Sequence, residues 1–317
     1  MLKLLGWAAL ALIGGFVALT LLLVQQRASQ ARVDFPPEGH FVDVDGHPVH
    51  YVMRGSGPDL VLLHGANGTT RDWTFAMADR LAQRYRVLIF DRPGLGYTPP
   101  LVRNMSVVDQ ARLLQGAAEA LGVTRPVVVG QSFGGAVTMA WAVHHPNNIA
   151  AAVSIAGATY PWEGGQGTLL YNVLALPVLG PALGHLIAAY APAGYVAERV
   201  RSVFEPDPAP EGYAAYIGIP VVLKPVNQVS NARQRMSLKA ELEELHVNYP
   251  DVTIPIEIVH GDADTTVGLT VHSIRLRDDA PNAALTVLNG AGHMPHHTHA
   301  DTVVAAIDRA AERAGLR

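Results

Sequence analysis

The stretch Val127-Val-Val-Gly-Gln-Ser132-Phe-Gly-Gly-Ala-Val-Thr-Met-Ala-Trp-Ala-Val-His-His145 decides how this chain folds. It opens with β-branched residues and continues with small and apolar residues at helical spacing, which predicts a strand, a tight turn and a helix. The turn, Gly130 to Gly134, matches G-x-S-x-G, a pattern that lifts a serine hydroxyl clear of the backbone. Ser132 is therefore the candidate nucleophile. The structural alternative is a serine that only caps the helix.

On both sides of this stretch, short apolar runs alternate with helical patterns. Runs at residues 60–63, 87–90, 150–155, 254–259 and 284–288 are rich in Val, Leu, Ile and Ala without strict alternation, as in parallel strands buried on both faces. Two further runs, 41–44 and 49–53, meet at Asp45-Gly46 and predict an edge hairpin. Helices are expected at 71–84, 106–121, 135–145, 271–277 and 301–313. The chain is predicted to adopt an α/β fold with a mostly parallel central sheet and helices on both faces.

Residues 158–253 interrupt the alternation with a Pro-, Gly-, Ala- and Leu-rich helical pattern. The segment is too long for one crossover helix, so it predicts a helical cap inserted before the strand that precedes Asp264. The core is then formed by residues 39–157 and 254–317. Before it lie an apolar segment, 1–27, and a tether, 28–38, that ends in two prolines.

The apolar segment predicts a single-pass transmembrane anchor. Leu4–Val24 carries no charge over 21 residues, about the length needed to cross a bilayer. Cleavage after Ser29-Gln30-Ala31 as a signal peptide is the alternative, but the apolar stretch exceeds the usual length of such a peptide. The flanking charges nearly tie, and the short tail before the span favours a body exported across a bacterial inner membrane.

Composition excludes several function classes. The net charge is −4 without a basic run, so nucleic-acid binding is not expected. The chain has no cysteine, which removes disulfides, thiolate metal sites and cysteine nucleophiles. No G-x-G-x-x-G opens the first strand and helix, so no dinucleotide cofactor is expected. Histidines gather at 293–299, and we expect a catalytic histidine there with no metal and no cofactor.

A serine hydroxyl needs a base, and the base needs an orienting carboxylate. Asp264 and His293 each follow a late predicted strand, and the order Ser132, Asp264, His293 is the expected one. Asp262 competes for the acid role but lies closer to its strand, where it suits a local turn. We therefore expect Ser132, Asp264 and His293 to form a catalytic triad.

The segment His64-Gly-Ala-Asn-Gly68 follows the strand at 60–63 and suits an oxyanion hole. Its small residues allow backbone N–H groups to approach a substrate carbonyl, with Ala66 as the first donor and Phe133 as the second. The neighbours Asn67 and Gln131 are expected to line the substrate pocket.

These motifs, together with Asp91-Arg-Pro-Gly-Leu-Gly-Tyr97, resemble those of α/β-hydrolase-fold serine hydrolases of the esterase, lipase and haloperoxidase-like branch. The resemblance covers roughly residues 40 to 317. It implies that residues 91–97 form a structural loop beside the site and that residues 158–253 are the cap that sets specificity. Ser132 argues against the epoxide hydrolases and haloalkane dehalogenases of this family, which attack with aspartate. Cofactor-free haloperoxidases and carbon–carbon bond hydrolases keep the serine and stay open as alternatives.

The expected reaction is hydrolysis of a carboxylic ester of an apolar small molecule or lipid. Cap stretches 173–179 and 183–191 lack charged residues, which favours an uncharged ester with an apolar part over charged small substrates. A membrane-tethered binding protein without turnover is the alternative from another class, since fold does not fix function.

Overall fold

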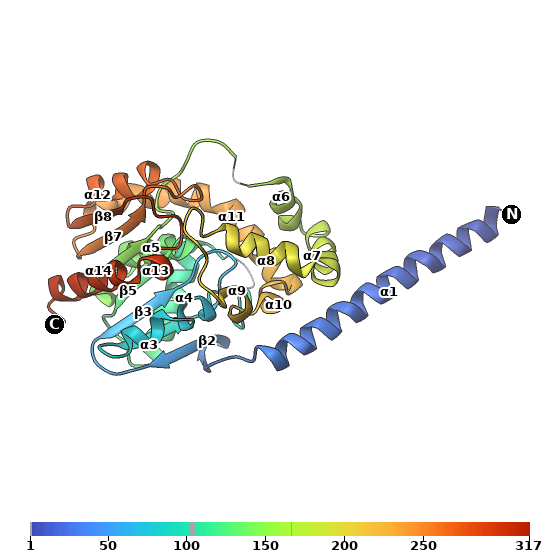
Figure 1. Ribbon diagram of the computed structural model, residues 1–317, viewed down its shortest axis with the longest axis horizontal. Coiled ribbons are helices and arrows are strands. Elements are labelled where there is room, and N and C mark those ends of the chain that lie inside the picture. Colours follow the sequence, from blue (N-terminus) through green and yellow to red (C-terminus); the bar gives the residue numbers. More distant parts are fainter. Residues whose placement is uncertain (1, 102–104, 166) are drawn as a thin grey trace.

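The computed structural model describes residues 2–101, 105–165 and 167–317 and contains an eight-stranded sheet in the order β1-β2-β4-β3-β5-β6-β7-β8 (Figure 1). Met1 of the expected anchor and Gln166 of the expected cap lie outside these residues. β1 (His40–Val44) and β2 (His47–Arg54) form the antiparallel hairpin, turning at Asp45 and Gly46, which both have positive φ. The remaining strands are parallel to one another: β3 (Asp59–Leu63), β4 (Arg86–Phe90), β5 (Val127–Gln131), β6 (Ala151–Ile155), β7 (Ile256–Gly261) and β8 (Ala283–Leu288).

The parallel strands read as continuous apolar runs because both faces of the sheet are covered. Side chains alternate between the faces, so Leu60 and Leu62 join one buried cluster while Val61 and Leu63 join the other. One face packs against α4 (Val107–Ala120) and α5 (Phe133–His144), and the other against α3 (Met77–Leu81) and α14 (Ala300–Arg313). The predicted fold class is confirmed.

Two sequence predictions of helices need correction. The helix expected at 71–84 is two short helices, α2 (Thr70–Thr74) and α3, because the chain leaves helical geometry at Ala76. The helix expected at 271–277 is a π-helical turn, η3 (Thr270–Ile274), followed by α12 (Arg275–Asp279). A short helix, α13 (Pro295–Thr298), precedes α14.

A helical cap leaves the core after β6 and returns at β7. Its helices are α6 (Leu169–Ala175), α7 (Leu179–Tyr190), α8 (Ala193–Ser202), α9 (Tyr213–Tyr216), α10 (Ile219–Val222) and α11 (Pro225–Leu245), followed by the 3-10 turn η2 (His246–Asp251). In Figure 1 these helices lie over one end of the sheet, between the core and the first helix. The long helix α11 reaches back onto the core cluster through Leu238, Leu242 and Leu245.

The first helix, α1 (Leu2–Asp34), projects from the body and is apolar all round over most of its length (Figure 1). The expected tether at 28–38 is therefore wrong in its first part, since residues 28–34 continue the helix. Only the short segment from Phe35 to Gly39 separates α1 from β1. From its middle onward α1 also packs against the cap: the Phe16 ring stacks on Tyr190, and Arg27 Nη1 donates to the Ala188 carbonyl at 3.0 Å.

Candidate active site

Ser132 lies between β5 and α5, which approach each other so closely that positions 130, 134 and 135 have room only for glycine. A Cβ built on Gly130 would lie 2.1 Å from the Gly134 carbonyl oxygen, and one on Gly134 would lie 2.4 Å from the Leu63 carbonyl oxygen. Gly135 is equally confined, since its Cβ would lie 2.7 Å from the Gly157 Cα. The glycines of G-x-S-x-G thus serve close packing of backbone on backbone.

The turn forces Ser132 into a backbone conformation that residues with a side chain avoid, with φ 53° and ψ −117°. Such a conformation costs roughly 1–3 kcal/mol and persists only where the surroundings impose it. Three backbone hydrogen bonds impose it here: the Ser132 N–H donates to Ile155 O at 3.0 Å, and its carbonyl accepts from Gly135 and Ala158.

The structure brings together the three residues expected to form the triad. The Ser132 hydroxyl lies 3.0 Å from His293 Nε2, and His293 Nδ1 lies 2.7 Å from Asp264 Oδ2. With Nδ1–H donating to the carboxylate, Nε2 is left as the acceptor for the serine proton. The arrangement can generate a serine nucleophile. Asp262 turns away and accepts from the Gly290 N–H at 2.6 Å, so it joins the loop after β7 to the loop after β8 and does not cap a turn of its own loop as the sequence predicted.

Asp264 is buried yet held as an anion. Burial alone would raise its pKa, but hydrogen bonds from His260 and His293 and from the Val267 amide hold the pKa well below its usual value. The Thr266 N–H also donates to Oδ1, at 2.7 Å. Both carboxylate oxygens of Asp264 therefore accept hydrogen bonds.

His260 was not assigned a role from the sequence. Its Nε2 lies 2.8 Å from the Val267 carbonyl and 3.2 Å from Asp264 Oδ2, and its Nδ1 is 2.6 Å from the Ser273 hydroxyl. The residue directly precedes Gly261 in the predicted acid loop, but nothing in the sequence shows that its ring folds back onto Asp264. It acts on the site by fixing the carboxylate.

Ala66 and Phe133 both line the cavity in front of Ser132, as expected for oxyanion donors. Within the described part of the chain, neither backbone N–H donates to another residue. The Phe133 amide begins α5, where helix N–H groups lack intrahelical partners. These two amides are thus free to bind a negatively charged oxygen.

Arg92 holds the oxyanion segment in shape from the loop at 91–97. Its guanidinium is buried and donates to the carbonyls of His64 and Gly65 at 2.8 and 2.9 Å, and it lies over the Phe133 ring. The His64 ring is neutral, since burial and the charge of Arg92 lower its pKa to about 4. The loop therefore borders the site and positions it.

A cavity of about 210 Å³ opens in front of Ser132 between the core and the cap. Its wall is mixed: Trp162, Leu238, Val267 and Val271 supply apolar surface, and polar side chains supply nearly as much. Asn67 and Gln131 do not line it, so the sequence prediction for these two residues is wrong.

Both residues instead brace the site. Gln131 is buried behind the turn, where its Nε2 donates to the His293 carbonyl at 3.1 Å. The Asn67 N–H donates to Asn231 Oδ1 at 2.8 Å, and its side-chain amide donates to the Tyr171 hydroxyl of the cap.

Two polar side chains on the cavity wall were not anticipated from the sequence. Arg235 lines the cavity with its guanidinium over the Tyr171 ring, and its Nε is buried without a hydrogen-bond partner. Among the described residues, Arg235 makes no ion pair. A buried guanidinium N–H is energetically costly unless another group accepts its hydrogen bond.

His272, on the π-helical turn η3, presents a neutral donor to the same cavity. Its Nδ1 accepts from the Thr159 and Tyr160 N–H groups at 3.2 and 3.1 Å, so the ring proton must be on Nε2. Burial and the nearby charge of His260 lower its pKa to about 4, which keeps the ring neutral at pH 7.

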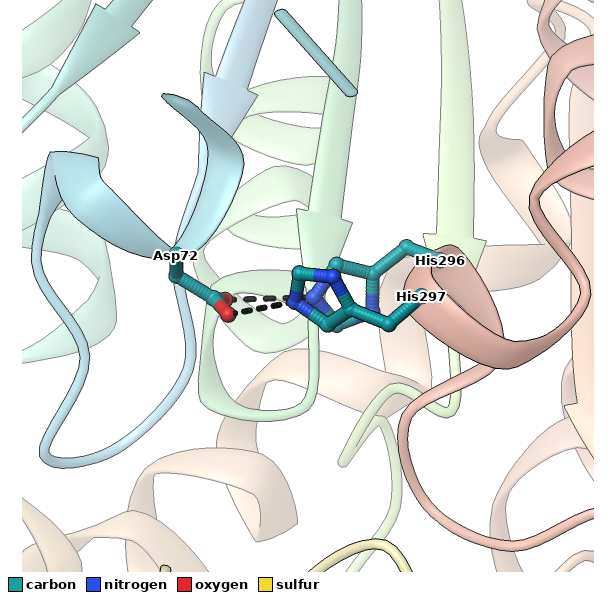
Figure 2. A group of neighbouring side chains, drawn as sticks. All are labelled: Asp72, His296 and His297. Atoms are coloured by element: carbon teal, nitrogen blue, oxygen red, sulfur yellow. Dashed lines mark hydrogen bonds and ion pairs between the residues drawn. The ribbon is translucent and has the colours of Figure 1, made fainter. Parts of the chain in front are cut away.

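A second buried group of titratable side chains lies beside the site, as Figure 2 shows. His296 and His297, just after the candidate base, point their Nε2 atoms at the Asp72 carboxylate at 3.2 and 2.9 Å. The Tyr213 hydroxyl donates to the same carboxylate at 2.7 Å. The group joins α2, α13 and the cap helix α9.

These three side chains offer ligand atoms close enough together for a metal ion. The fit is nevertheless poor, because the Nδ1 atoms of His296 and His297 are buried without partners. A metal-bound histidine normally donates its second ring N–H to an acceptor. Hydrogen bonds to an ionised Asp72 account for the geometry without a metal ion.

Comparison with known proteins identifies relatives over most of the chain. The family model described as "Alpha/beta hydrolase family" matches residues 60–306. An uncharacterized protein of Mycobacterium tuberculosis is 25% identical over 278 residues, covering 83% of this chain and 77% of that protein. A 2-hydroxy-6-oxononadienedioate/2-hydroxy-6-oxononatrienedioate hydrolase of a Pseudomonas species is 25% identical over 267 residues, covering 80% of this chain and 88% of that enzyme.

Solved structures share the fold. An alpha/beta hydrolase fold protein from Burkholderia ambifaria superposes with a TM-score of 0.69 at 22% identity, covering 86% of this chain and 97% of that one.

The backbone of Ser132 generates a prediction about stability. Ser132→Gly removes the Cβ that the positive φ disfavours, so it should stabilise the fold by about 1 kcal/mol relative to Ser132→Ala. Chemical denaturation of the two variants measures the difference. Equal stability would show that the turn is not strained at this residue.

The Asp72 group generates a second prediction. Asp72→Asn leaves buried donors without a charged acceptor and should cost about 1–3 kcal/mol of unfolding free energy. Because the pKa of Asp72 is depressed, this contribution is present above the unfolded pKa near 3.8 and is lost as the pH falls through the lower folded value. Asp79→Asn is the control, since Asp79 pairs with Arg54 at the surface. Thermal melts at neutral pH should separate the two variants, and equal melting temperatures would remove the stabilising role assigned to the group.

Proposed function

Because the chain belongs to the alpha/beta hydrolase family, we propose that it is a serine hydrolase that cleaves a carboxylic ester through an acyl-enzyme on Ser132. The observation that carries the proposal is the continuous chain of contacts from Ser132 through His293 to Asp264. Two free backbone amides, those of Ala66 and Phe133, and a cavity that opens onto Ser132 also support the proposal.

In the proposed mechanism, His293 Nε2 takes the hydroxyl proton as Ser132 Oγ attacks the ester carbonyl. The Ala66 and Phe133 amides stabilise the oxyanion that forms. His293 then gives the proton to the leaving alcohol, and the acyl group stays on Ser132. A water molecule, deprotonated by His293, releases the acid by the same steps in reverse. Asp264 holds the imidazole in the tautomer that both steps need and stabilises its charged form.

The cavity wall changes the substrate proposed from the sequence, which was an uncharged ester, because Arg235 lines the cavity. Its apolar part supports an ester with an apolar chain, as the cap sequence predicts, while Arg235 and the Nε2–H of His272 support an oxygen-rich, anionic group elsewhere on the substrate. We therefore propose an amphiphilic ester, apolar over most of its surface and carrying one carboxylate or phosphate.

A carbon–carbon bond hydrolase is the second candidate. The Pseudomonas relative is named for a substrate that is a dioate, and Arg235 supplies a cation to the cavity here. Turnover of a 2-hydroxy-6-oxo-dienedioate by the purified protein, without turnover of esters of any chain length, would favour this candidate over the esterase.

We further propose that α1 anchors the protein in a membrane. An 18-residue window of this helix reaches a mean hydropathy of 2.4, and its apolar side chains are largely exposed. With only Phe35 to Gly39 between the helix and the first strand, the body would be held at the bilayer surface. The orientation we propose is the one expected from the sequence, with the body exported to the outer face of a bacterial inner membrane.

The nucleophile is tested by covalent labelling. A fluorophosphonate should add to Ser132 and to no other residue, as located by mass spectrometry, and Ser132→Ala should lower kcat by several orders of magnitude. An adduct elsewhere, or an unchanged kcat, would refute the acyl-enzyme mechanism.

Substrate charge is tested with matched esters. Arg235→Met keeps a flexible apolar stem but removes the guanidinium charge, so kcat/KM for mono-p-nitrophenyl glutarate should fall at least about tenfold relative to that for p-nitrophenyl pentanoate. The control is Arg233→Met, two residues away on the same helix and exposed. An equal loss for both esters would mean that Arg235 only packs against Tyr171.

A further inference from the structure

The cap carries an apolar surface beside α1 that the hydrolytic site does not use. From Gly164 to Ala197 the sequence contains no Asp, Glu, Lys or Arg. Within it, α6 and α7 expose large apolar side chains, of which Leu169 and Val178 are 78% and 79% exposed. We call this surface the cap patch; its exposed members are Leu169, Leu170, Leu176, Val178, Leu179, Leu186 and Tyr190.

Small residues explain why these side chains point outward. Gly180, Gly184, Ala188 and Ala189 form the buried stripe of α7, and a Cβ on Gly184 would lie 3.3 Å from the Pro225 carbonyl oxygen. The larger residues of α7 are therefore left on its outer side. Contiguous exposed apolar surface of this kind marks an interaction site on a folded protein.

The contact between α1 and α7 fixes what the patch meets. The Phe16 ring stacks on Tyr190 with ring centroids 5.9 Å apart, and the Thr20 hydroxyl lies 3.0 Å from the Tyr190 hydroxyl. Phe16 precedes Val24, the end of the apolar segment, by eight residues, or about 12 Å along the helix axis. If residues 4–24 fill the bilayer, Tyr190 lies well below its surface.

Tyr190 remains within the bilayer even if the membrane boundary is placed elsewhere along α1. The part of α1 before Phe16, residues 2–15, is only about 21 Å long, which is less than the ~30 Å of the hydrocarbon layer. The helix cannot cross the bilayer using that part alone. Either α1 does not span, or the residues that touch α7 lie within the membrane and bring α7 with them.

We infer that the cap patch is embedded in one leaflet of the membrane that α1 crosses, as a second attachment of the same molecule to lipid. The inference rests on the proposed anchor. α6 and α7 are together apolar enough to span but are bent by 117° at the break between them, which suits entry into one leaflet and not a crossing. Arg27, bonded to the Ala188 carbonyl, then lies at the level of the headgroups.

The absence of cysteine allows a direct test with single labelled sites in the full chain. Leu12→Cys on α1, Val178→Cys in the cap patch and Val247→Cys on η2 are each labelled with an environment-sensitive NBD dye, and the proteins are reconstituted in phosphatidylcholine/phosphatidylglycerol vesicles. The three native side chains are exposed to similar extents, 76%, 79% and 63%. All three substitutions lie outside the proposed triad and the cavity wall.

The expected result is blue-shifted emission and quenching by spin-labelled lipids at Leu12 and Val178, with neither at Val247. Quenching at Leu12 but not at Val178 would overturn the inference and leave the anchor intact. No quenching at either site would refute the anchor as well. A blue shift at Val178 without lipid quenching would assign the cap patch to contact with a second copy of the chain and would also overturn the inference.

Leu169→Cys on α6 supplies a second site in the patch, so a result does not depend on one variant. Hydrolysis of a soluble p-nitrophenyl ester should be unchanged in every labelled protein, which separates the membrane contact from the chemistry. Loss of that activity on Ser132→Ala, with lipid quenching at Val178 retained, would show that the two properties are independent.

Discussion

The close approach of β5 and α5 at Ser132 is the constraint on which the rest of the site depends. A Cβ added at position 130 or 134 would lie only 2.1–2.4 Å from a backbone oxygen, so both positions require glycine. Ser132 then takes a conformation that costs energy, and the neighbouring strand β6 repays it through the bond to Ile155. With Ser132 fixed at the carboxyl end of β5, the loops after β7 and β8 need only reach across the same sheet edge to bring Asp264 and His293 to it.

Buried carboxylates around this edge follow one physical pattern. Asp264, Asp72 and Asp91 are each buried, and each accepts hydrogen bonds from at least one histidine. Asp264 and Asp91 also accept from backbone N–H groups. Because a hydrogen-bonded anion in a low-dielectric setting is held rigidly, these carboxylates fix the ring orientation of the histidines beside them. The site is positioned by charge-assisted hydrogen bonds more than by ion pairs with arginine or lysine.

The fold, and the three residues that meet at the candidate site, could be predicted from the sequence because their signals are local. A strand followed by G-x-S-x-G, and Asp264 and His293 each just past a strand, depend only on neighbours in the chain. Arg235, His272 and His260 lacked such a signal, since their positions follow from how the cap and η3 pack. Gln131 was misplaced for the same reason: adjacency to Ser132 predicts the pocket, but successive strand residues point to opposite sides. The tether was misread because Gln, Arg and Ala continue a helix as readily as they form a linker.

The cap helix α6 joins the two surfaces that define how this molecule meets a substrate. On one side it exposes Leu169 and Leu170, and on the other it carries Tyr171, whose ring lies under the Arg235 guanidinium and whose hydroxyl accepts from Asn67 in the oxyanion segment. Tyr171 on α6 thus links the Arg235 guanidinium of the cavity to the loop that carries Ala66. If the cap patch is embedded as we propose, the helix that contacts lipid is also the helix that orders the cavity wall.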